Sequence, residues 1–156
     1  MSLLLALVLV CPASHAQPPR GGAKFGVGVG GGLGVSGLSG KLWLSDQNAL
    51  QGVVGAWGVG RGDGRGEGLG VSIDYLWEMP VLATTEPMLL AWNLGLGGSA
   101  GATSPAWLGV SGVAGLEFNF QPVPLDVTLE YRPGIGIVPG VTADLVNFTG
   151  HLRVHF

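Results

Sequence analysis

The last fourteen residues of the chain, 143–156, read ADLVNFTGHLRVHF. From Val146 to Phe156 every second residue is apolar or glycine, and the residues between them are polar. Strict alternation of this kind predicts a β-strand with one apolar and one polar face. The run exceeds the usual strand length of about 5–6 residues and fits a tilted, membrane-crossing strand of about 9–11 residues. The stretch therefore predicts the closing strand of a small membrane β-barrel.

The composition is too apolar for an ordinary soluble domain. Charged residues make up 11% of the 156, against about 25% in soluble proteins, and the mean hydropathy is +0.47. No run approaches the roughly 18 apolar residues of a membrane-spanning helix. Alternating strands explain both facts, because each strand places its apolar residues at every second position. The net charge of −3, without a Lys/Arg cluster, argues against a nucleic-acid partner.

The first sixteen residues are a segment of another kind. Residues 3–10 form a short apolar core, and Ser14 and Ala16 are small residues before a cleavage point, as in a secretory signal peptide. No Lys or Arg precedes that core, which leaves an upstream start codon open. Cys11 is the only cysteine; lipid attachment there is the less favoured alternative to removal with the leader. We expect a signal peptide over 1–16 and a barrel over 17–156.

The same alternation recurs seven more times, and the connections are short or rich in glycine. We therefore predict an all-β fold, an eight-stranded antiparallel up-and-down barrel in which an even strand count returns the chain to its starting side. The facing of the third strand is a guess. The predicted strands cover residues 24–31, 38–45, 49–58, 69–78, 88–98, 106–118, 125–132 and 143–156.

The connections indicate which ends of the strands face outward. Residues 61–68 read RGDGRGEG and predict an extracellular loop, whereas residues 46–48 form a tight turn on the periplasmic side. The Arg-Gly-Asp tripeptide at 61–63 suggests an integrin ligand, but a solvated hairpin tip is the favoured interpretation. Residues 99–105 and 133–142 are expected to be loops.

The two faces of the predicted strands distinguish a membrane barrel from a soluble sandwich. The polar face is mostly Gly, Ser, Asn and Thr, which suits a barrel interior better than a surface in water. The apolar face carries aromatic residues near strand ends, as in the interfacial girdles of membrane barrels. This predicted aromatic girdle consists of Tyr75, Trp77, Trp92 and Tyr131. Only helices and closed barrels satisfy every backbone polar group in a bilayer, and no segment is long enough for a helix.

The chain resembles the small eight-stranded outer-membrane barrels of OmpA/OmpX type over nearly its whole mature length. The terminal Leu152, Val154 and Phe156 resemble the assembly signal that the barrel-assembly machinery reads in that class. Residues 37–50 and 74–77 resemble segments of small uncharacterised bacterial outer-membrane barrels. The resemblance implies a location in the bacterial outer membrane, with membrane lipids and the assembly machinery as partners. It implies little about activity.

The inward faces predict a charged lumen. An eight-stranded interior is only just wide enough for side chains, and charges there must be paired or hydrated. We expect a polar network that fills the lumen, with a narrow gated pathway as the alternative. The expected members are Lys24, Lys41, Asp74, Glu78, Asn93, Glu117, Asp126, Glu130, Arg132, His151, Arg153 and His155. Inward glycines are expected to make room for Trp43 or Trp57 or to allow tight curvature; a small acyl-chain cavity is the alternative.

Catalysis is the least favoured interpretation. A hydroxyl nucleophile needs a base in hydrogen-bond reach. Ser72 or Ser111 with His151 and Glu117 are formal candidates for such a set, but no recognised catalytic motif joins them. Two histidines on one strand face lack a third metal ligand, and no cofactor motif is present. We predict a non-catalytic, monomeric barrel with a structural or surface-interaction role through its extracellular loops, facing an unidentified surface ligand. A small pore or hydrophobic-ligand barrel is the first alternative, and a lipid A-modifying enzyme the second.

Overall fold

The computed structural model describes residues 24–58, 68–121 and 123–156. These described residues form strands and the connections between them, and they contain no helix. No helix long and apolar enough to cross a membrane is therefore present among them. The strands are β1 (Phe25–Gly31), β2 (Val35–Ser45), β3 (Asn48–Trp57), β4 (Gly68–Glu78), β5 (Ala83–Thr84), β6 (Met88–Ala102), β7 (Trp107–Phe120), β8 (Leu125–Tyr131), β9 (Gly134–Val138), β10 (Thr142–Asp144) and β11 (Phe148–His155).

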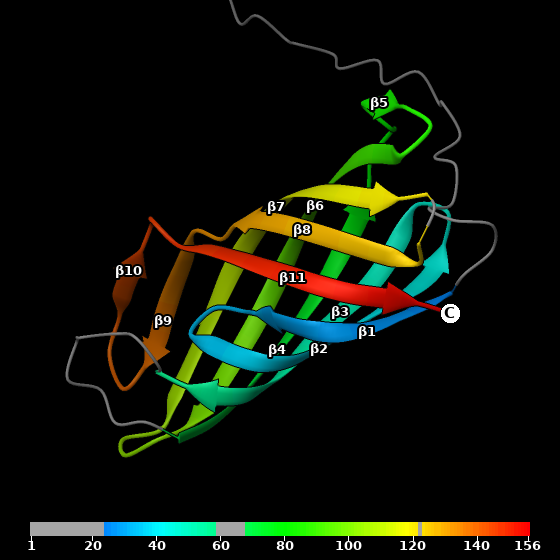
Figure 1. Cartoon of the computed structure of the whole chain (residues 1–156). Coiled ribbons are helices and arrows are strands. Elements are labelled where there is room, and N and C mark those ends of the chain that lie inside the picture. Colours follow the sequence, from blue (N-terminus) through cyan, green and yellow to red (C-terminus); the bar gives the residue numbers. More distant parts are fainter. Residues whose placement is uncertain (1–23, 59–67, 122) are drawn as a thin grey trace, which may run out of the picture.

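Eight of these strands form a closed antiparallel barrel, in the order β1-β2-β3-β4-β6-β7-β8-β11 (Figure 1). The ladder between β1 and β11 closes it, and this ladder is called the closing seam below. The seam extends only from the Gly26–His155 pair to the Gly30–His151 pair, whereas the β6–β7 ladder runs nearly the full length of both strands. The predicted eight-stranded antiparallel barrel is confirmed.

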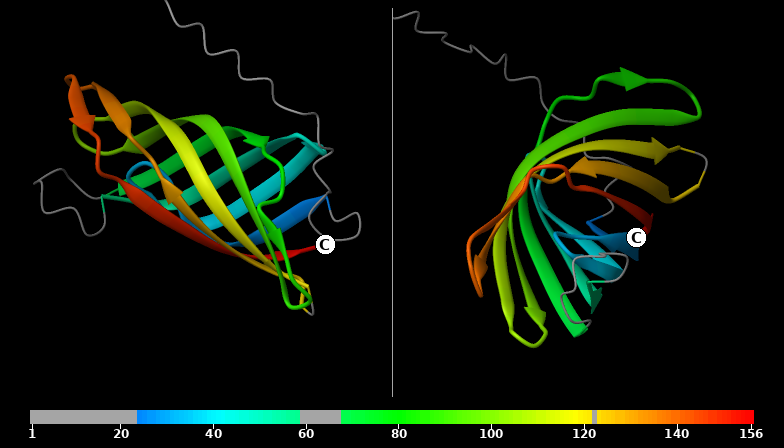
Figure 2. Two further views of the ribbon diagram at one scale, coloured as in Figure 1. Left: turned by 90° about the horizontal axis from the view of Figure 1, so that it is seen from above. Right: turned by 90° about the vertical axis from the view of Figure 1, so that its left-hand side faces the viewer.

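The two rims of the barrel carry different kinds of connection. β1 begins and β11 ends at one rim, called the proximal rim, where the connections from β2 to β3, β4 to β6 and β7 to β8 also lie (Figure 1). The opposite, distal rim holds the β1–β2 and β6–β7 connections. There β9 pairs with β7 beyond the end of β8, and β10 pairs with β9. The β9–β10 hairpin thus extends the wall at the distal rim (Figure 2).

Several predicted strand limits are wrong, two of them in glycine-rich or small-residue segments. β6 runs on to Ala102, although residues 99–105 were expected to be a loop. The expected loop at 133–142 contains β9, whose isoleucines continue the alternation on a glycine background. The terminal strand divides into β10 and β11, with a break at residues 145–147. Small residues signal turns in a sequence, yet their backbones pair once a neighbouring strand offers a ladder.

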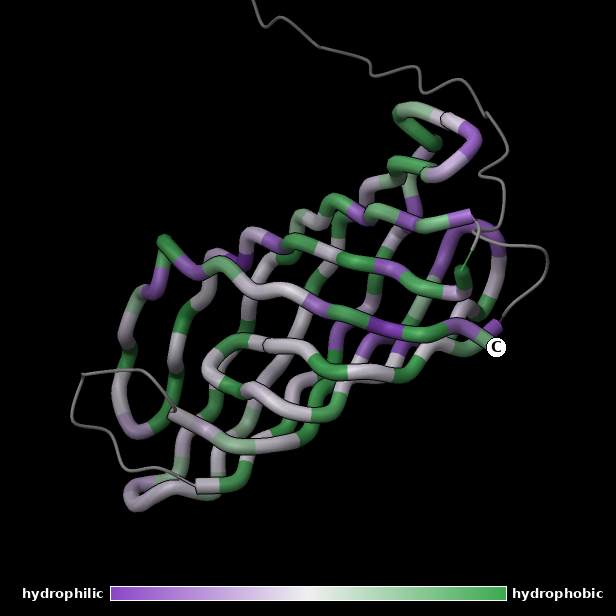
Figure 3. The backbone as a smooth tube through the Cα atoms, in the orientation of Figure 1, coloured by the Kyte–Doolittle hydropathy of each residue, from purple (hydrophilic) through white to green (hydrophobic). Residues whose placement is uncertain are grey.

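The wall is apolar outside and polar inside. In β4, Leu69 and Ile73 are 73% and 61% exposed, whereas Ser72 and Asp74 are 1% and 0% exposed. In β3, Gln51, Val53 and Trp57 face inward and Leu50, Val54 and Ala56 face outward, the facing guessed from the sequence. Hydropathy alternates along the strands, and hydrophilic positions gather toward the proximal rim, where the C-terminus lies (Figure 3). This polarity is the reverse of a soluble protein, in which charged residues are almost never fully buried.

Candidate functional site

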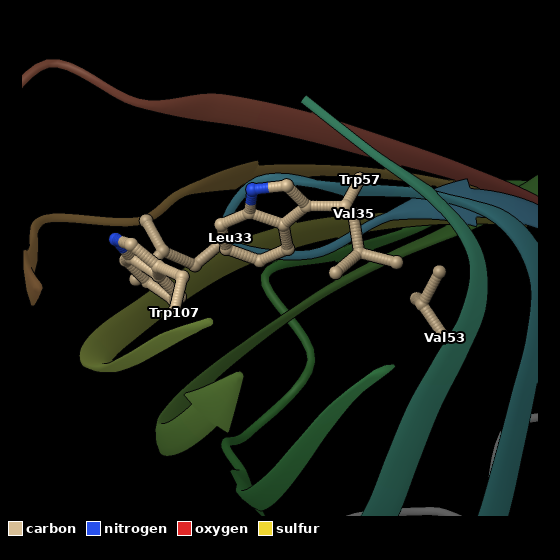
Figure 4. Close-up of a cluster of buried hydrophobic side chains, with 5 residues drawn as sticks. All are labelled: Leu33, Val35, Val53, Trp57 and Trp107. Atoms are coloured by element: carbon tan, nitrogen blue, oxygen red, sulfur yellow. The ribbon is translucent and has the colours of Figure 1, made fainter. Parts of the chain in front are cut away.

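The distal half of the lumen is filled by an apolar cluster. Its members are Leu33, Val35, Val53, Trp57 and Trp107, and their side chains point toward one another (Figure 4). The Trp57 and Trp107 rings lie 4.3 Å apart, centroid to centroid. A Cβ at Gly101 would come within 2.5 Å of the Trp57 ring, and a Cβ at Gly109 would overlap the Trp107 ring. Inward glycines therefore make room for tryptophans, and Trp107 is an occupant that the sequence analysis did not single out.

On the proximal side of this cluster, Arg132 lies at the centre of a buried layer of ion pairs. Its Nη1 and Nη2 donate hydrogen bonds of 2.9 and 2.6 Å to the two oxygens of Asp74. Its Nε donates to Glu130 at 2.7 Å. The amide nitrogen of Gln51 bridges the same two carboxylates at 3.2 and 2.9 Å. Charge-assisted, two-pronged contacts of this kind are geometrically specific, so the layer fixes β3, β4 and β8 relative to one another.

Arg153 makes the second layer. It donates hydrogen bonds to Gln51 Oε1 at 2.5 Å, to Thr128 Oγ1 at 2.8 Å and to Asp126 Oδ1 at 3.2 Å. These partners lie on β3 and β8, on either side of the closing seam. A single β11 side chain therefore spans the interior from one seam flank to the other.

Lys41 makes the third layer, toward the proximal rim. Its ammonium contacts Glu117 closely and lies 2.7 Å from Glu78 Oε1. Asn93 donates a 2.6 Å hydrogen bond to the same Glu117 oxygen, and the ammonium lies 4.9 Å from the centroid of the Trp43 ring. One compact cation thus compensates two carboxylates from β4 and β7.

The two histidines of β11 each contact a carboxylate of β8. His151 Nε2 lies 3.1 Å from Glu130 Oε2, and His155 Nε2 contacts Asp126. On its other side His151 Nδ1 lies 2.8 Å from Ser39 Oγ of β2. The His155 ring packs beside the Trp43 ring, with centroids 4.9 Å apart.

Ser39, His151 and Glu130 follow the order of a nucleophile, a base and an orienting carboxylate. The hydroxyl that reaches His151 is that of Ser39 rather than of Ser72 or Ser111. Ser72 instead accepts a hydrogen bond from Ser99 at 2.9 Å. Ser39 and His151 are 2% and 3% exposed, so no substrate reaches the hydroxyl in this conformation. The arrangement serves as a hydrogen-bond chain across the lumen.

One predicted member of the polar network lies outside it. Lys24 precedes β1 at the proximal rim and is exposed, whereas the other members named from the sequence are inward-facing and shielded from solvent. The strand parity that pointed Lys24 inward ends at Phe25, where the ladder with β2 begins. Among the described residues, no three His, Cys, Asp or Glu side chains gather in a metal-binding arrangement.

The predicted aromatic girdle lies on the outer wall. Tyr75 and Trp77 contact each other edge to face with centroids 5.4 Å apart, near the proximal end of β4. Tyr131 ends β8; its ring packs on Phe148, and its hydroxyl donates to the Leu145 carbonyl at 2.8 Å. Trp92 faces outward and is partly exposed.

The residues of the predicted assembly signal are also on this wall. Leu152, Val154 and Phe156 are exposed, and the Phe156 amide donates to the Phe25 carbonyl at 2.9 Å. The Arg-Gly-Asp tripeptide and the predicted signal peptide lie outside the described residues.

Two apolar hollows lie against the outer wall. One, of about 480 Å³, sits where β8 gives way to β9 and is lined by Leu96, Val110, Ile135 and Leu145 among others. The other, of about 530 Å³, lies against β4, β6 and β7, with Leu69, Val71 and Leu108 in its lining. These lining residues are exposed outward-facing side chains, so both hollows open on the apolar exterior.

Comparison of the chain with protein-family models, with curated protein sequences and with solved structures found no match.

Proposed function

We propose that the chain is an integral outer-membrane β-barrel that is non-catalytic, has a filled lumen, and acts as a structural or surface-interaction protein. The observation that carries this proposal is the reversed polarity of the closed wall. Apolar side chains cover the exterior while charged side chains are buried. In water that arrangement would expose a continuous apolar surface far larger than the few hundred Å² that monomeric soluble proteins expose.

A lipid environment explains the same arrangement. Closure through the β1–β11 ladder leaves the barrel strands without a free edge along most of their length, as the apolar interior of a bilayer requires. The outward rings of Tyr75, Trp77 and Tyr131 fit the interfaces of a bilayer. With a leader over 1–16 removed, the proximal rim would face the periplasm and the distal rim the exterior.

The filled lumen supports a role outside it. Trp57 and Trp107 occupy the distal half, and three layers of ion pairs occupy the rest, each with side chains that are essentially inaccessible to solvent. Such an interior favours neither a pore nor a binding cavity. The surface for a partner is then the set of distal connections, including the β9–β10 hairpin, on a monomeric barrel.

A charge on the outer wall distinguishes lipid from water. Ile73 lies at the middle of β4 and is 61% exposed. Ile73→Lys should cost about 2–4 kcal/mol in a bilayer if Ile73 is near its midplane. The matched variant Leu69→Lys, near the distal rim, should cost about 0–1 kcal/mol. Urea unfolding of the reconstituted barrel in phospholipid vesicles measures both.

Equal and negligible costs for the two lysines would contradict a lipid-facing wall. Location is tested separately by membrane fractionation with a heat-modifiable gel shift. Recovery of the folded protein from the soluble periplasm would overturn the proposal.

A further inference from the structure

The hollow where β8 gives way to β9, called the β8–β9 hollow below, has a floor without a side chain. That floor is Gly112, which faces outward on β7 between Leu96 of β6 and Pro133. In the β6–β7 ladder Gly112 lies opposite Leu96, and its amide donates a 2.9 Å hydrogen bond to the Pro133 carbonyl. A Cβ added at Gly112 would meet only Pro133, at 3.7 and 4.0 Å. The wall is therefore one side chain thinner at this point than around it.

Exposed apolar side chains form the sides of the β8–β9 hollow. Leu96 of β6, Val110 of β7 and Ile135 of β9 stand outward around the glycine. Leu145, in the link between β10 and β11, also lines the hollow, and its carbonyl accepts a 2.8 Å hydrogen bond from the Tyr131 hydroxyl. Backbone ladders and this bond hold the lining residues, so the hollow is formed before anything enters it. Binding to a preformed site avoids the cost of ordering it.

The lining side chains of the hollow offer apolar contact and no hydrogen bonding. Ser111 is the one polar residue among the described lining residues, and it belongs to the inward face of β7, with 6% of its surface exposed. The volume of about 480 Å³ lies within the range of about 300–1,000 Å³ that is typical of small-molecule sites. The lining therefore selects a hydrocarbon as the occupant.

The surroundings of the hollow indicate which hydrocarbon it takes. On a lipid-facing wall an unfilled hollow is unfavourable, because its lining atoms lose dispersion contacts on one side. A second barrel fits poorly, since proteins associate in membranes through small residues that let two backbones approach closely. Gly112 instead lies recessed behind the exposed side chains of Leu96 and Ile135. A single flexible acyl chain can pass between those side chains, and a bilayer supplies such chains in excess.

We propose that the β8–β9 hollow is a lipid-binding site that takes one acyl chain of a membrane lipid from the leaflet on the distal side. The chain lies over Gly112 and exchanges more slowly than the lipids around the rest of the wall. This inference rests on the proposed lipid-facing wall, but it adds a defined site to a surface that otherwise contacts lipid uniformly.

Photolabelling of the reconstituted barrel tests the site. The probe is a phosphatidylcholine with a diazirine in the middle of one acyl chain, mixed into phosphatidylcholine vesicles, and mass spectrometry of peptides locates the adducts. Leu96 in the hollow is 62% exposed, and Ile73 and Leu38 elsewhere on the wall are 61% and 64% exposed. Bulk lipid should therefore label the three residues equally, whereas a bound chain should give excess labelling at Leu96 and at Ile135.

The outcomes separate this inference from the proposed function. Equal labelling of Leu96, Ile73 and Leu38 would overturn the site but leave a lipid-facing wall standing. Labelling of Leu96 below that of the other two would also overturn it, because it would indicate a protein partner over the hollow. No labelling of any of the three would refute the lipid-facing wall, and the site with it.

A variant that fills the hollow from its floor provides a second test. Gly112→Leu places its Cβ at ordinary contact distance from Pro133, so the barrel should fold, and labelling of Leu96 should fall to the level of Ile73. Gly40→Leu is the matched control, since Gly40 faces outward on β2 with its nearest neighbours 3.9 Å from an added Cβ, and it should leave the excess unchanged. Excess labelling that persists in folded Gly112→Leu would overturn the proposal. Should that variant fail to fold, the labelling pattern of the unmodified chain still decides.

Discussion

Removing the Arg132 guanidinium while keeping the bulk of its side chain, in Arg132→Met, tests whether the ion-pair layers hold the barrel together. Arg132 is fully buried and donates two hydrogen bonds to Asp74 and one to Glu130. Hydrogen bonds to charged groups contribute about 1.5–3 kcal/mol each, and breaking a buried ion pair costs about 3–5 kcal/mol. We therefore expect the free energy of unfolding to fall by about 3–5 kcal/mol.

The assay is equilibrium urea unfolding of the reconstituted barrel, followed by tryptophan fluorescence. Lys24→Met is the matched control: it also removes one positive charge, but at an exposed rim position, and should change stability by less than about 0.5 kcal/mol. Asp74→Asn should be destabilising alone, and the double variant should lose less than the two single losses combined, with a coupling of about 0.5–3 kcal/mol. A loss below about 1 kcal/mol for Arg132→Met, or strict additivity with Asp74→Asn, would refute the reasoning.

Four further predictions address the apolar cluster, the closing seam, an unpaired amide and the C-terminal residue. Trp57→Ala should cost about 3–5 kcal/mol in unfolding experiments, yet planar bilayers should show no channel currents because the charged layers still fill the lumen; steady currents would contradict a filled interior. Gly28→Ala should impair folding because its Cβ would overlap the Leu152 backbone, whereas Gly40→Ala, whose nearest neighbours are 3.9 Å away, should be tolerated; equal heat-modifiable gel shifts would contradict this. Asn119→Leu should stabilise the barrel by about 1–3 kcal/mol, since the fully buried amide has no hydrogen-bond partner among the described residues; a lower urea midpoint would argue against it. Phe156→Ala keeps the backbone hydrogen bonds to Phe25 and Lys24, so it should lower the yield of assembled barrel in cells but leave the stability of refolded protein unchanged, and an unaltered yield would count against an assembly signal.

Facing could be predicted from the sequence because it depends only on local alternation. Leu69, Val71 and Ile73 alternate with polar residues in β4, and no knowledge of neighbouring strands is needed to place them outside. The same rule correctly placed the other carboxylates and cations of the expected network inside, but it wrongly placed Lys24 there. The limits of the strands were harder to predict from the sequence, because the small residues at the distal ends of β6 and β9 indicate turns as readily as strands.

Partners inside the lumen could not be predicted, because they depend on register and on the stagger between strands. Ser39 rather than Ser72 or Ser111 meets His151 because Gly30 of the intervening β1 lets the imidazole pass over it. Trp107 fills the distal lumen because Gly109 leaves room for its ring. A glycine in a sequence indicates space, but only the pairing of strands decides which side chain occupies it.

The crossing of the seam by β11 side chains also bears on the order of folding. The Ser39–His151 contact joins residues 112 positions apart, and the Arg153–Gln51 contact joins residues 102 positions apart. Contacts of such high sequence separation form late, after the entropy of closing a long loop has been lost. Until β11 pairs, Asp126 of β8 lacks its Arg153 partner, whereas Glu130 already has Arg132. A chain cut before residue 148 would therefore hold an open sheet in which Asp126 lacks its Arg153 partner, so that closing the barrel and pairing this buried carboxylate are one event.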